Sequence, residues 1–168
     1  MKKFELTSES IVNIFGKKLF RIKALVEFGN VKEGEIGGFV EKEENLSHDG
    51  NAWVYGDAWV YGNAKVSGNA KVCGDAEVCG NAWVCGNAKV CGDARVCRNA
   101  DYATIKGFGT EYRTTTFFKC RDRVTRVRCG CFYGDLEQFR NQVKNTRKGK
   151  IAEEYLMIAD LMEKHFDK

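Results

Sequence analysis

The sequence predicts a mainly β protein: a left-handed parallel β-helix of hexapeptide repeats, with an N-terminal β-hairpin cap and a C-terminal ββαα cap. Residues 51–98 form eight consecutive hexads of the pattern [Asn/Asp]-Ala-x-Val-x-Gly, with Arg98 in place of the last glycine. The first position of the hexads, continued to Asn99, repeats the order Asn-Asp-Asn, which adds a period of 18 residues. We therefore expect an N-terminal cap over residues 1–44, the β-helix over 45–104 and a C-terminal domain over 105–168.

Each hexad combines one short strand with one turn. Valine fills the fourth position of all eight hexads between two variable residues, which is the alternation of a strand that buries one face. Glycine followed by Asn or Asp is a turn signal, because these residues tolerate positive φ. Three hexads make one coil of a three-sided prism, so residues 18 apart should stack about 4.8 Å from each other. Degenerate hexads are expected at residues 45–50, with His48 in the valine position, and at residues 99–104.

The 18-residue period sorts the outward side chains into three columns. In one column Glu77 stacks on Arg95, and we expect an ion pair between them. Trp53 and Trp59 lie in the first coil, where the N-terminal segment should cover them. Trp83 lies between Lys65 and Asp101 in another column and is the better candidate for contact with a partner or with a second copy of the chain.

The flanking segments predict the caps. Residues 10–15 and 19–28, joined by Gly16 and Lys17, predict a β-hairpin. Residues 114–120 and 124–132 predict two strands. Asp135 followed by Gln138 forms a capping box that starts a helix ending near Thr146. A second helix over residues 150–165 has apolar residues on one face: Ile151, Tyr155, Ile158, Met162 and Phe166.

Composition favours a cytoplasmic protein without a membrane segment. No apolar run approaches the ~18 residues of a membrane span, and the N-terminus lacks the apolar stretch of a signal peptide. The chain has eight cysteines, and five of them recur every six residues with the repeat. In the absence of a secretory signal we expect these five to be reduced thiols: Cys73, Cys79, Cys85, Cys91 and Cys97.

The sequence contains few side chains that are suited to catalysis or metal binding. An acyltransferase of this fold class, acting at an inter-subunit cleft, would need a histidine base, and the chain has only His48 and His165. The place of His48 in the repeat favours a structural role, and no loop interrupts the hexads. Two histidines cannot form a three-histidine zinc site. We expect the aspartates and asparagines of the first hexad position to bond their own turn backbones. We predict no catalytic residue, metal or cofactor.

Excess positive charge lies in the C-terminal third. Residues 105–168 carry fourteen basic and nine acidic side chains, whereas the whole chain has a net charge of +4. A basic cluster within ten residues, opposed only by Asp122, could bind phosphates or an acidic protein surface, or could simply be solvated. This cluster, with Trp83, forms our set of candidate partner-binding residues: Lys119, Arg121, Arg123, Arg126 and Arg128.

Two stretches carry a resemblance to a known family. FRIKALVEFGNVKEGEIGGFVEKEEN (residues 20–45), followed by LSHDGNAWVYGDAWVYGNA, resembles the YdcK-like hexapeptide-repeat proteins of bacteria and their phages, over residues 19–104. The segment CGCFYGDLEQF is similar to a tail on small phage and prophage versions. The resemblance implies a left-handed β-helix and no established activity.

These observations together predict a non-enzymatic binding protein. A phage or prophage origin would favour a small protein that binds and inhibits or redirects a host protein, for example in anti-phage immunity. Three alternatives stay open: an acyltransferase, a self-assembling module that forms a homo-oligomer, and a nucleic-acid-binding protein that uses the basic cluster.

Overall fold

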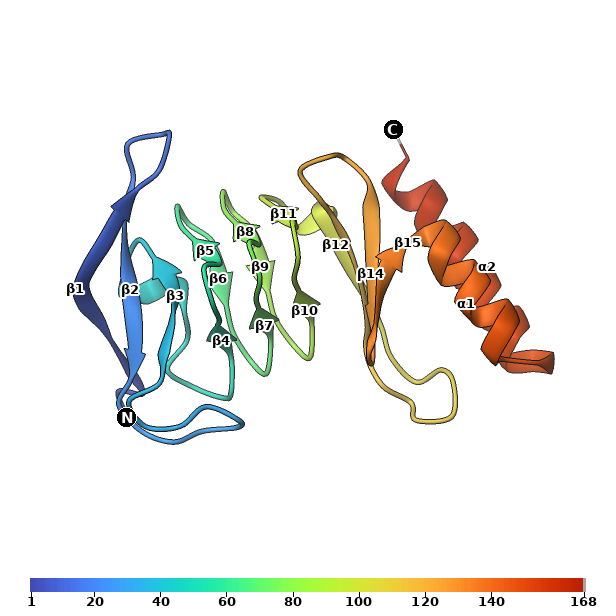
Figure 1. Ribbon diagram of the computed structural model, residues 1–168, viewed down its shortest axis with the longest axis horizontal. Coiled ribbons are helices and arrows are strands. Elements are labelled where there is room, and N and C mark those ends of the chain that lie inside the picture. The colour runs from blue at the N-terminus through green and yellow to red at the C-terminus, as the bar shows by residue number, and fades with distance from the viewer. Residues whose placement is uncertain (168) are drawn as a thin grey trace. The chain divides into compact units, whose positions relative to one another are not determined.

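The hexads form stacked parallel coils of a β-solenoid, as the computed structural model, which describes residues 1–167, shows (Figure 1). Each hexad contributes a two-residue strand and a turn. The strands lie in three sheet columns, β4-β7-β10, β6-β9 and β5-β8-β11. Their bounds are β4 Trp53–Val54, β5 Trp59–Val60, β6 Lys65–Val66, β7 Lys71–Val72, β8 Glu77–Val78, β9 Trp83–Val84, β10 Lys89–Val90 and β11 Arg95–Val96.

Neighbouring coils pair in the register that the 18-residue period predicts. Lys71 pairs with Lys89 and Lys65 with Trp83. Each hexad valine is fully buried and each hexad alanine is 0–1% exposed, so the two inward positions form the solenoid core. This burial is the main stabilising contribution of the repeat.

Turn geometry explains the glycine and asparagine positions. The glycines that end the hexads have φ between 59° and 67°, a region that other residues rarely adopt. The asparagine side chains bond from coil to coil: Asn51 Nδ2 donates to Asn69 Oδ1 (3.2 Å), and Asn69 Nδ2 to Asn87 Oδ1 (3.1 Å). Our expectation that each asparagine would bond its own turn backbone was therefore wrong for this column, because the next amide lies within reach one coil away.

The N-terminal segment forms the predicted hairpin and continues one solenoid sheet. β1 (Phe4–Val12) and β2 (Lys18–Ala24) are antiparallel, and β3 (Ile36–Val40) pairs with β2 on one side and, in parallel, with β5 on the other. The hairpin begins at Phe4, six residues before the predicted start. Asn13 closes its turn by accepting the N–H groups of Phe15 and Lys17, both at 3.0 Å.

Residues near the N-terminus cover Trp53. This side chain is fully buried, and its ring packs edge-on against Phe4 and Phe28, with centroids 6.3 and 5.4 Å away. Trp59 is partly buried and packs against a cluster that contains Leu19 and Phe39. The predicted cover is confirmed for Trp53, whereas Trp59 is covered only in part.

The first coil deviates from the predicted register. Leu46, not His48, pairs with Val66, a separation of 20 residues instead of 18, and Leu46 is 1% exposed. The cause is Asn45, at the end of the 3-10 helix η1 (Glu43–Asn45). Its buried side-chain amide donates to Gly62 O (3.2 Å) and Ala64 O (2.8 Å). These bonds hold the chain two residues away from the 18-residue register.

The last predicted hexad, residues 99–104, is not part of the solenoid. Asn99–Asp101 forms the 3-10 helix η2, and Tyr102–Ile105 forms β12, which pairs antiparallel with β13. The physical reason lies in the preceding turn. Arg98 replaces the glycine there and does not adopt positive φ, so the chain does not turn into another coil.

The chain divides into two compact units, Met1–Asn99 and Ala100–Lys168. In the second, a β12-β13-β14-β15 sheet packs against α1 (Leu136–Thr146) and α2 (Gly149–Phe166) (Figure 1). Its other strands are β13 Thr115–Lys119, β14 Thr125–Cys129 and β15 Phe132–Asp135. The predicted ββαα unit thus gains two strands, since Gly130 (φ 58°) splits the expected 124–132 strand and β12 joins the sheet.

The helices agree with the predictions. Asp135 Oδ1 accepts the N–H of Gln138 (2.8 Å), and Gln138 Oε1 accepts the N–H of Asp135 (2.9 Å), so the capping box is confirmed. Buried side chains of α2 face the sheet in the core: Tyr155, Ile158, Met162 and Phe166. Within residues 1–167, no helix is long and apolar enough to cross a membrane.

Candidate binding surfaces

Trp83 borders a groove in the solenoid unit. Its side chain is 53% exposed, yet its Nε1 donates to Ser67 Oγ (2.7 Å), and its backbone N–H donates to Asn99 Oδ1 (2.8 Å). The groove beside it has a volume of about 530 Å³. We call it the Trp83 groove, and it is lined by Glu43, Glu44, Leu46, Ser47, His48, Lys65, Val66, Ser67 and Trp83.

His48 lines this groove and is held in position by its neighbours. Its Nδ1 accepts the N–H of Lys3 (3.2 Å), and its Nε2 donates to Glu43 Oε1 (2.7 Å). The ring stacks on Phe4 at 4.4 Å. The hydrogen bond from His48, assisted by Lys2, holds the pKa of Glu43 below its ordinary value. Because both ring nitrogens are engaged, His48 has no free lone pair with which to accept a proton from a substrate.

The basic cluster occupies the β13–β14 hairpin. Lys119 ends β13, Arg121 and Arg123 lie in the turn, and Arg126 and Arg128 lie on β14. Arg126 and Arg128 share a strand face, while Val127 is fully buried on the opposite face.

One member of the cluster is neutralised within the hairpin. The Arg126 guanidinium donates to both carboxylate oxygens of Asp122, at 2.8 and 2.6 Å, which raises the pKa of Arg126. Asp122 therefore reduces the charge that the hairpin offers to a partner. Arg123, exposed and with φ of 68°, presents its charge from the turn.

We expect the carboxyl group of Asp122 to stay ionised down to about pH 2. Hydrogen bonds from Arg126 and from the Val124 N–H hold the pKa of Asp122 at about 2, below the ordinary 3.8. A carboxyl whose pKa is lower in the folded state stabilises the fold above its unfolded pKa, and this contribution is lost as the pH falls through the folded value. NMR titration of the carboxyl measures this pKa. In Arg126→Gln it should return towards 3.8, and an unchanged value would contradict the assignment.

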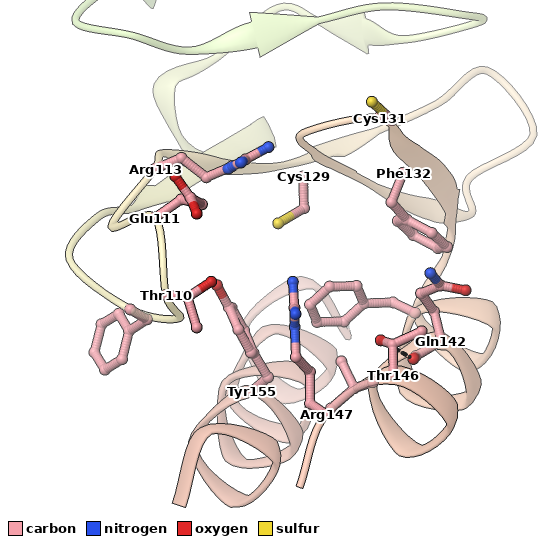
Figure 2. A pocket seen from close by; sticks show the side chains of 13 residues that line it. Thr110, Glu111, Arg113, Cys129, Cys131, Phe132, Gln142, Thr146, Arg147 and Tyr155 are labelled. Atoms are coloured by element: carbon pink, nitrogen blue, oxygen red, sulfur yellow. Dashed lines mark hydrogen bonds between the residues drawn. The ribbon is translucent and has the colours of Figure 1, made fainter.

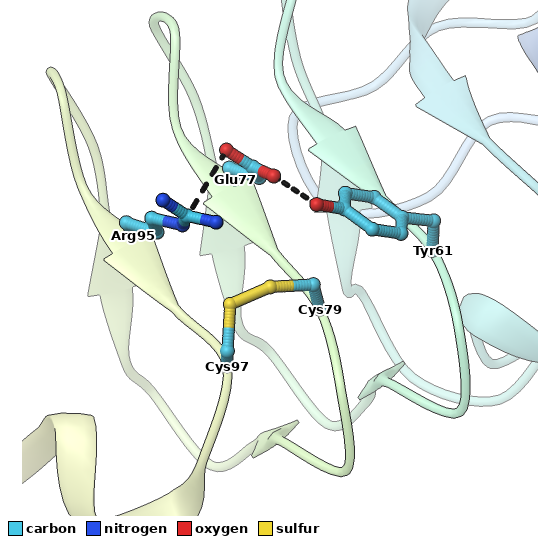
Figure 3. Close-up of a disulfide and its surroundings, with 5 residues drawn as sticks. All are labelled: Tyr61, Glu77, Cys79, Arg95 and Cys97. Atoms are coloured by element: carbon cyan, nitrogen blue, oxygen red, sulfur yellow. Dashed lines mark hydrogen bonds and ion pairs between the residues drawn. A yellow bond between two sulfur atoms is a disulfide. The ribbon is translucent and has the colours of Figure 1, made fainter. Parts of the chain in front are cut away.

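A disulfide joins Cys79 and Cys97 in neighbouring coils (Figure 3). The expectation of reduced thiols was wrong for this pair. Residues 18 apart stack in register, which brings the two Cα atoms to 4.3 Å. The other three cysteines of the repeat are not disulfide-bonded.

A buried carboxylate lies beside the disulfide (Figure 3). Glu77 is 7% exposed, accepts a hydrogen bond from the Tyr61 hydroxyl, and lies 4.0 Å from Arg95 Nε. The predicted Glu77–Arg95 pair is confirmed. Sequence analysis missed the contact with Tyr61, which comes from the preceding coil of the same column.

Sequence analysis also missed a cavity in the C-terminal unit (Figure 2). It has a volume of about 260 Å³, and Arg113, Arg147 and Tyr155 are among the residues that line it. The hydroxyl of Tyr155, on the otherwise apolar face of the second predicted helix, was the one signal for a polar contact there.

Comparison with known proteins does not identify the function of these sites. No protein-family model matches the chain, and no curated protein matches it. The resemblance to YdcK-like proteins therefore stays a prediction. Among residues 1–167, no group of three or more His, Cys, Asp or Glu side chains is placed to hold a metal ion.

Proposed function

We propose that the protein is a non-enzymatic binding protein whose Trp83 groove contacts another protein, which the sequence resemblance suggests is a bacterial host protein. Its body would be a left-handed β-helix capped by the N-terminal hairpin. The observation that carries this proposal is a half-exposed tryptophan held in one orientation by a 2.7 Å hydrogen bond to Ser67.

A fixed exposed tryptophan suits protein recognition. Tryptophan is enriched among residues that dominate the energy of protein interfaces. Because the Ser67 bond and the β6–β9 pairing already restrict Trp83, binding would cost little side-chain entropy. Lys65 and the carboxylates of Glu43 and Glu44 place charges of both signs on the groove, and these can form the polar rim around an apolar contact.

The basic hairpin would provide a second contact, to acidic side chains. Arg123 is exposed in the turn, and Arg128 is half-buried on β14. Arg126 would contribute less, because Asp122 already compensates its charge. Such charges mainly raise the rate of association and add specificity.

Acyl transfer has less support. That reaction needs a base that removes a proton from the acceptor, and the two nitrogens of His48 are engaged by Lys3 and Glu43. Incubation with acetyl-CoA and a panel of acceptors should release no thiol. Thiol release that is lost in His48→Ala would replace the binding proposal with an enzymatic one.

We expect Trp83→Ala to weaken partner binding by about 30-fold or more, the effect of losing an interface hot spot. The matched control is Ile36→Ala, which removes an apolar side chain of similar exposure (52%) from β3 of the same unit. The measurement is affinity capture from nuclease-treated host lysate, followed by calorimetry with the captured protein. Equal affinity of Trp83→Ala and Ile36→Ala for that protein, or capture of nucleic acid alone, would sink the proposal.

A further inference from the structure

The cavity of the C-terminal unit has aromatic walls. Phe132 and Phe139 lie 5.6 Å apart between ring centroids, and Phe139 meets Tyr155 edge-on at 5.8 Å. Phe108, from the loop between β12 and β13, lines the same space. A planar ring placed here would add to an existing cluster of edge-on and tilted aromatic contacts.

Two guanidinium groups line this cavity: that of Arg147 extends toward Cys129, and that of Arg113 lies along the opposite edge (Figure 2). Arg113 belongs to the loop before β13 and lies directly against Gly130, where a side chain would collide with its Nη1. Arg147 follows the last residue of α1, where its N–H bonds to Val143 O (2.8 Å). Within the described residues 1–167, neither guanidinium forms an ion pair with a carboxylate.

The polar groups between the arginines complete the site. The buried Tyr155 and the thiol of Cys129 line the cavity, and Cys129 Sγ accepts a hydrogen bond from Thr115 Oγ1 (3.1 Å). Burial and the neighbouring Cys129 raise the pKa of Tyr155, against smaller opposing effects of Arg147 and Arg113. Glu111 also lines the cavity, which leaves one net positive charge on its walls.

We propose that this cavity binds a small organic anion: one aromatic ring that carries a carboxylate or phosphate group. The ring would pack against Phe132, Phe139 and Tyr155, and the anionic group would lie between Arg113 and Arg147. Guanidinium groups bind both kinds of anion through paired N–H donors. A volume of about 260 Å³ limits the ligand to about one ring with its substituent.

Four small probes separate the contributions of charge and ring. Phenyl phosphate and benzoate carry the ring with each type of anion, and benzamide is the neutral control. Isothermal titration calorimetry with the full chain should show that phenyl phosphate or benzoate binds at least tenfold more tightly than benzamide. Which of the two anions binds better decides between the phosphate and carboxylate chemistries. Inorganic phosphate, which lacks the ring, should bind more weakly than phenyl phosphate.

Charge variants test the two arginines. Arg113→Gln and Arg147→Gln should each weaken binding of the preferred probe at least tenfold, and both residues are exposed enough that folding should be unaffected. Lys148→Gln is the matched control, because this exposed neighbour of Arg147 does not line the cavity. Glu111→Gln should tighten binding, since it removes the negative charge.

Three results would overturn the proposal. The first is an affinity for benzamide that equals the affinity for both phenyl phosphate and benzoate, which would mean that charge has no role. The second is unchanged affinity in both arginine variants, whose folding is checked by circular dichroism. The third is the absence of binding by any probe at millimolar concentration. The Trp83 groove belongs to the other unit, so these outcomes are independent of the proposed function.

Discussion

Replacing Trp53 by alanine is expected to lower the free energy of unfolding of the solenoid unit by about 3–5 kcal/mol, the usual cost of removing a large buried aromatic side chain. Trp53 has no exposed surface and contacts both Phe4 and Phe28, so its loss leaves a cavity where the N-terminal segment meets the first coil. Urea unfolding followed by the remaining tryptophan fluorescence measures the change. The three tryptophans all lie within residues 1–99, so the signal reports on this unit.

The same substitution at Trp83 provides the control. Since Trp83 is half exposed, Trp83→Ala should change the stability by no more than about 0.5 kcal/mol. Trp53→Phe should be milder than Trp53→Ala, because it keeps an aromatic ring and removes an Nε1–H group that has no hydrogen-bond partner among the described residues. Equal losses for Trp53→Ala and Trp83→Ala would contradict the burial of Trp53.

Removing the Cys79–Cys97 disulfide is expected to cost about 3 kcal/mol, the value for a closed loop of this length. The bond joins residues 18 apart and restricts the unfolded chain across a whole coil. We expect Cys97→Ser to lower the urea midpoint of tryptophan fluorescence, and a reducing agent to lower the wild-type midpoint to a similar value. Free-thiol titration of the unfolded protein would confirm the number of reduced cysteines in each sample.

Cys85→Ser is the matched control for this experiment. It changes an exposed cysteine in the same sequence position of another hexad, one that is not disulfide-bonded. Its stability should match that of the wild type, with and without the reducing agent. If Cys97→Ser and Cys85→Ser unfolded at the same urea concentration as the oxidised wild type, the disulfide would not contribute to stability.

The repeat could be predicted because each hexad has the same sequence pattern, which determines its local structure. Valine and alanine point inward, and glycine allows the turn at every corner, so the register of Glu77 and Arg95 followed from their spacing alone. The ends could not be predicted in the same way. There the structure depends on particular tertiary contacts, such as the amide of Asn45 that shifts Leu46 by two residues, and on one missing glycine at Arg98.

Among the candidate sites too, some could be predicted from the repeat pattern and others depend on tertiary contacts. The exposure of Trp83 followed from its place in a column of outward side chains. The anion cavity did not follow from any pattern, because Arg113 and Arg147 come from a loop and a helix end that are far apart in sequence. The disulfide was missed for a different reason: the stacking of Cys79 on Cys97 was predicted, but their oxidation state was inferred from the expected compartment.

The 18-residue column spacing limits which deletions and insertions of hexads the solenoid can accept. Loss of three hexads would shorten the solenoid by one coil and leave each later residue in its original column. Loss of a single hexad would instead turn everything after it by one side of the prism, and a loss between Cys79 and Cys97 would break their spacing of one coil. Length variants that remain folded and functional should therefore differ by 18 residues, although the six-residue unit is the one that the sequence repeats most visibly.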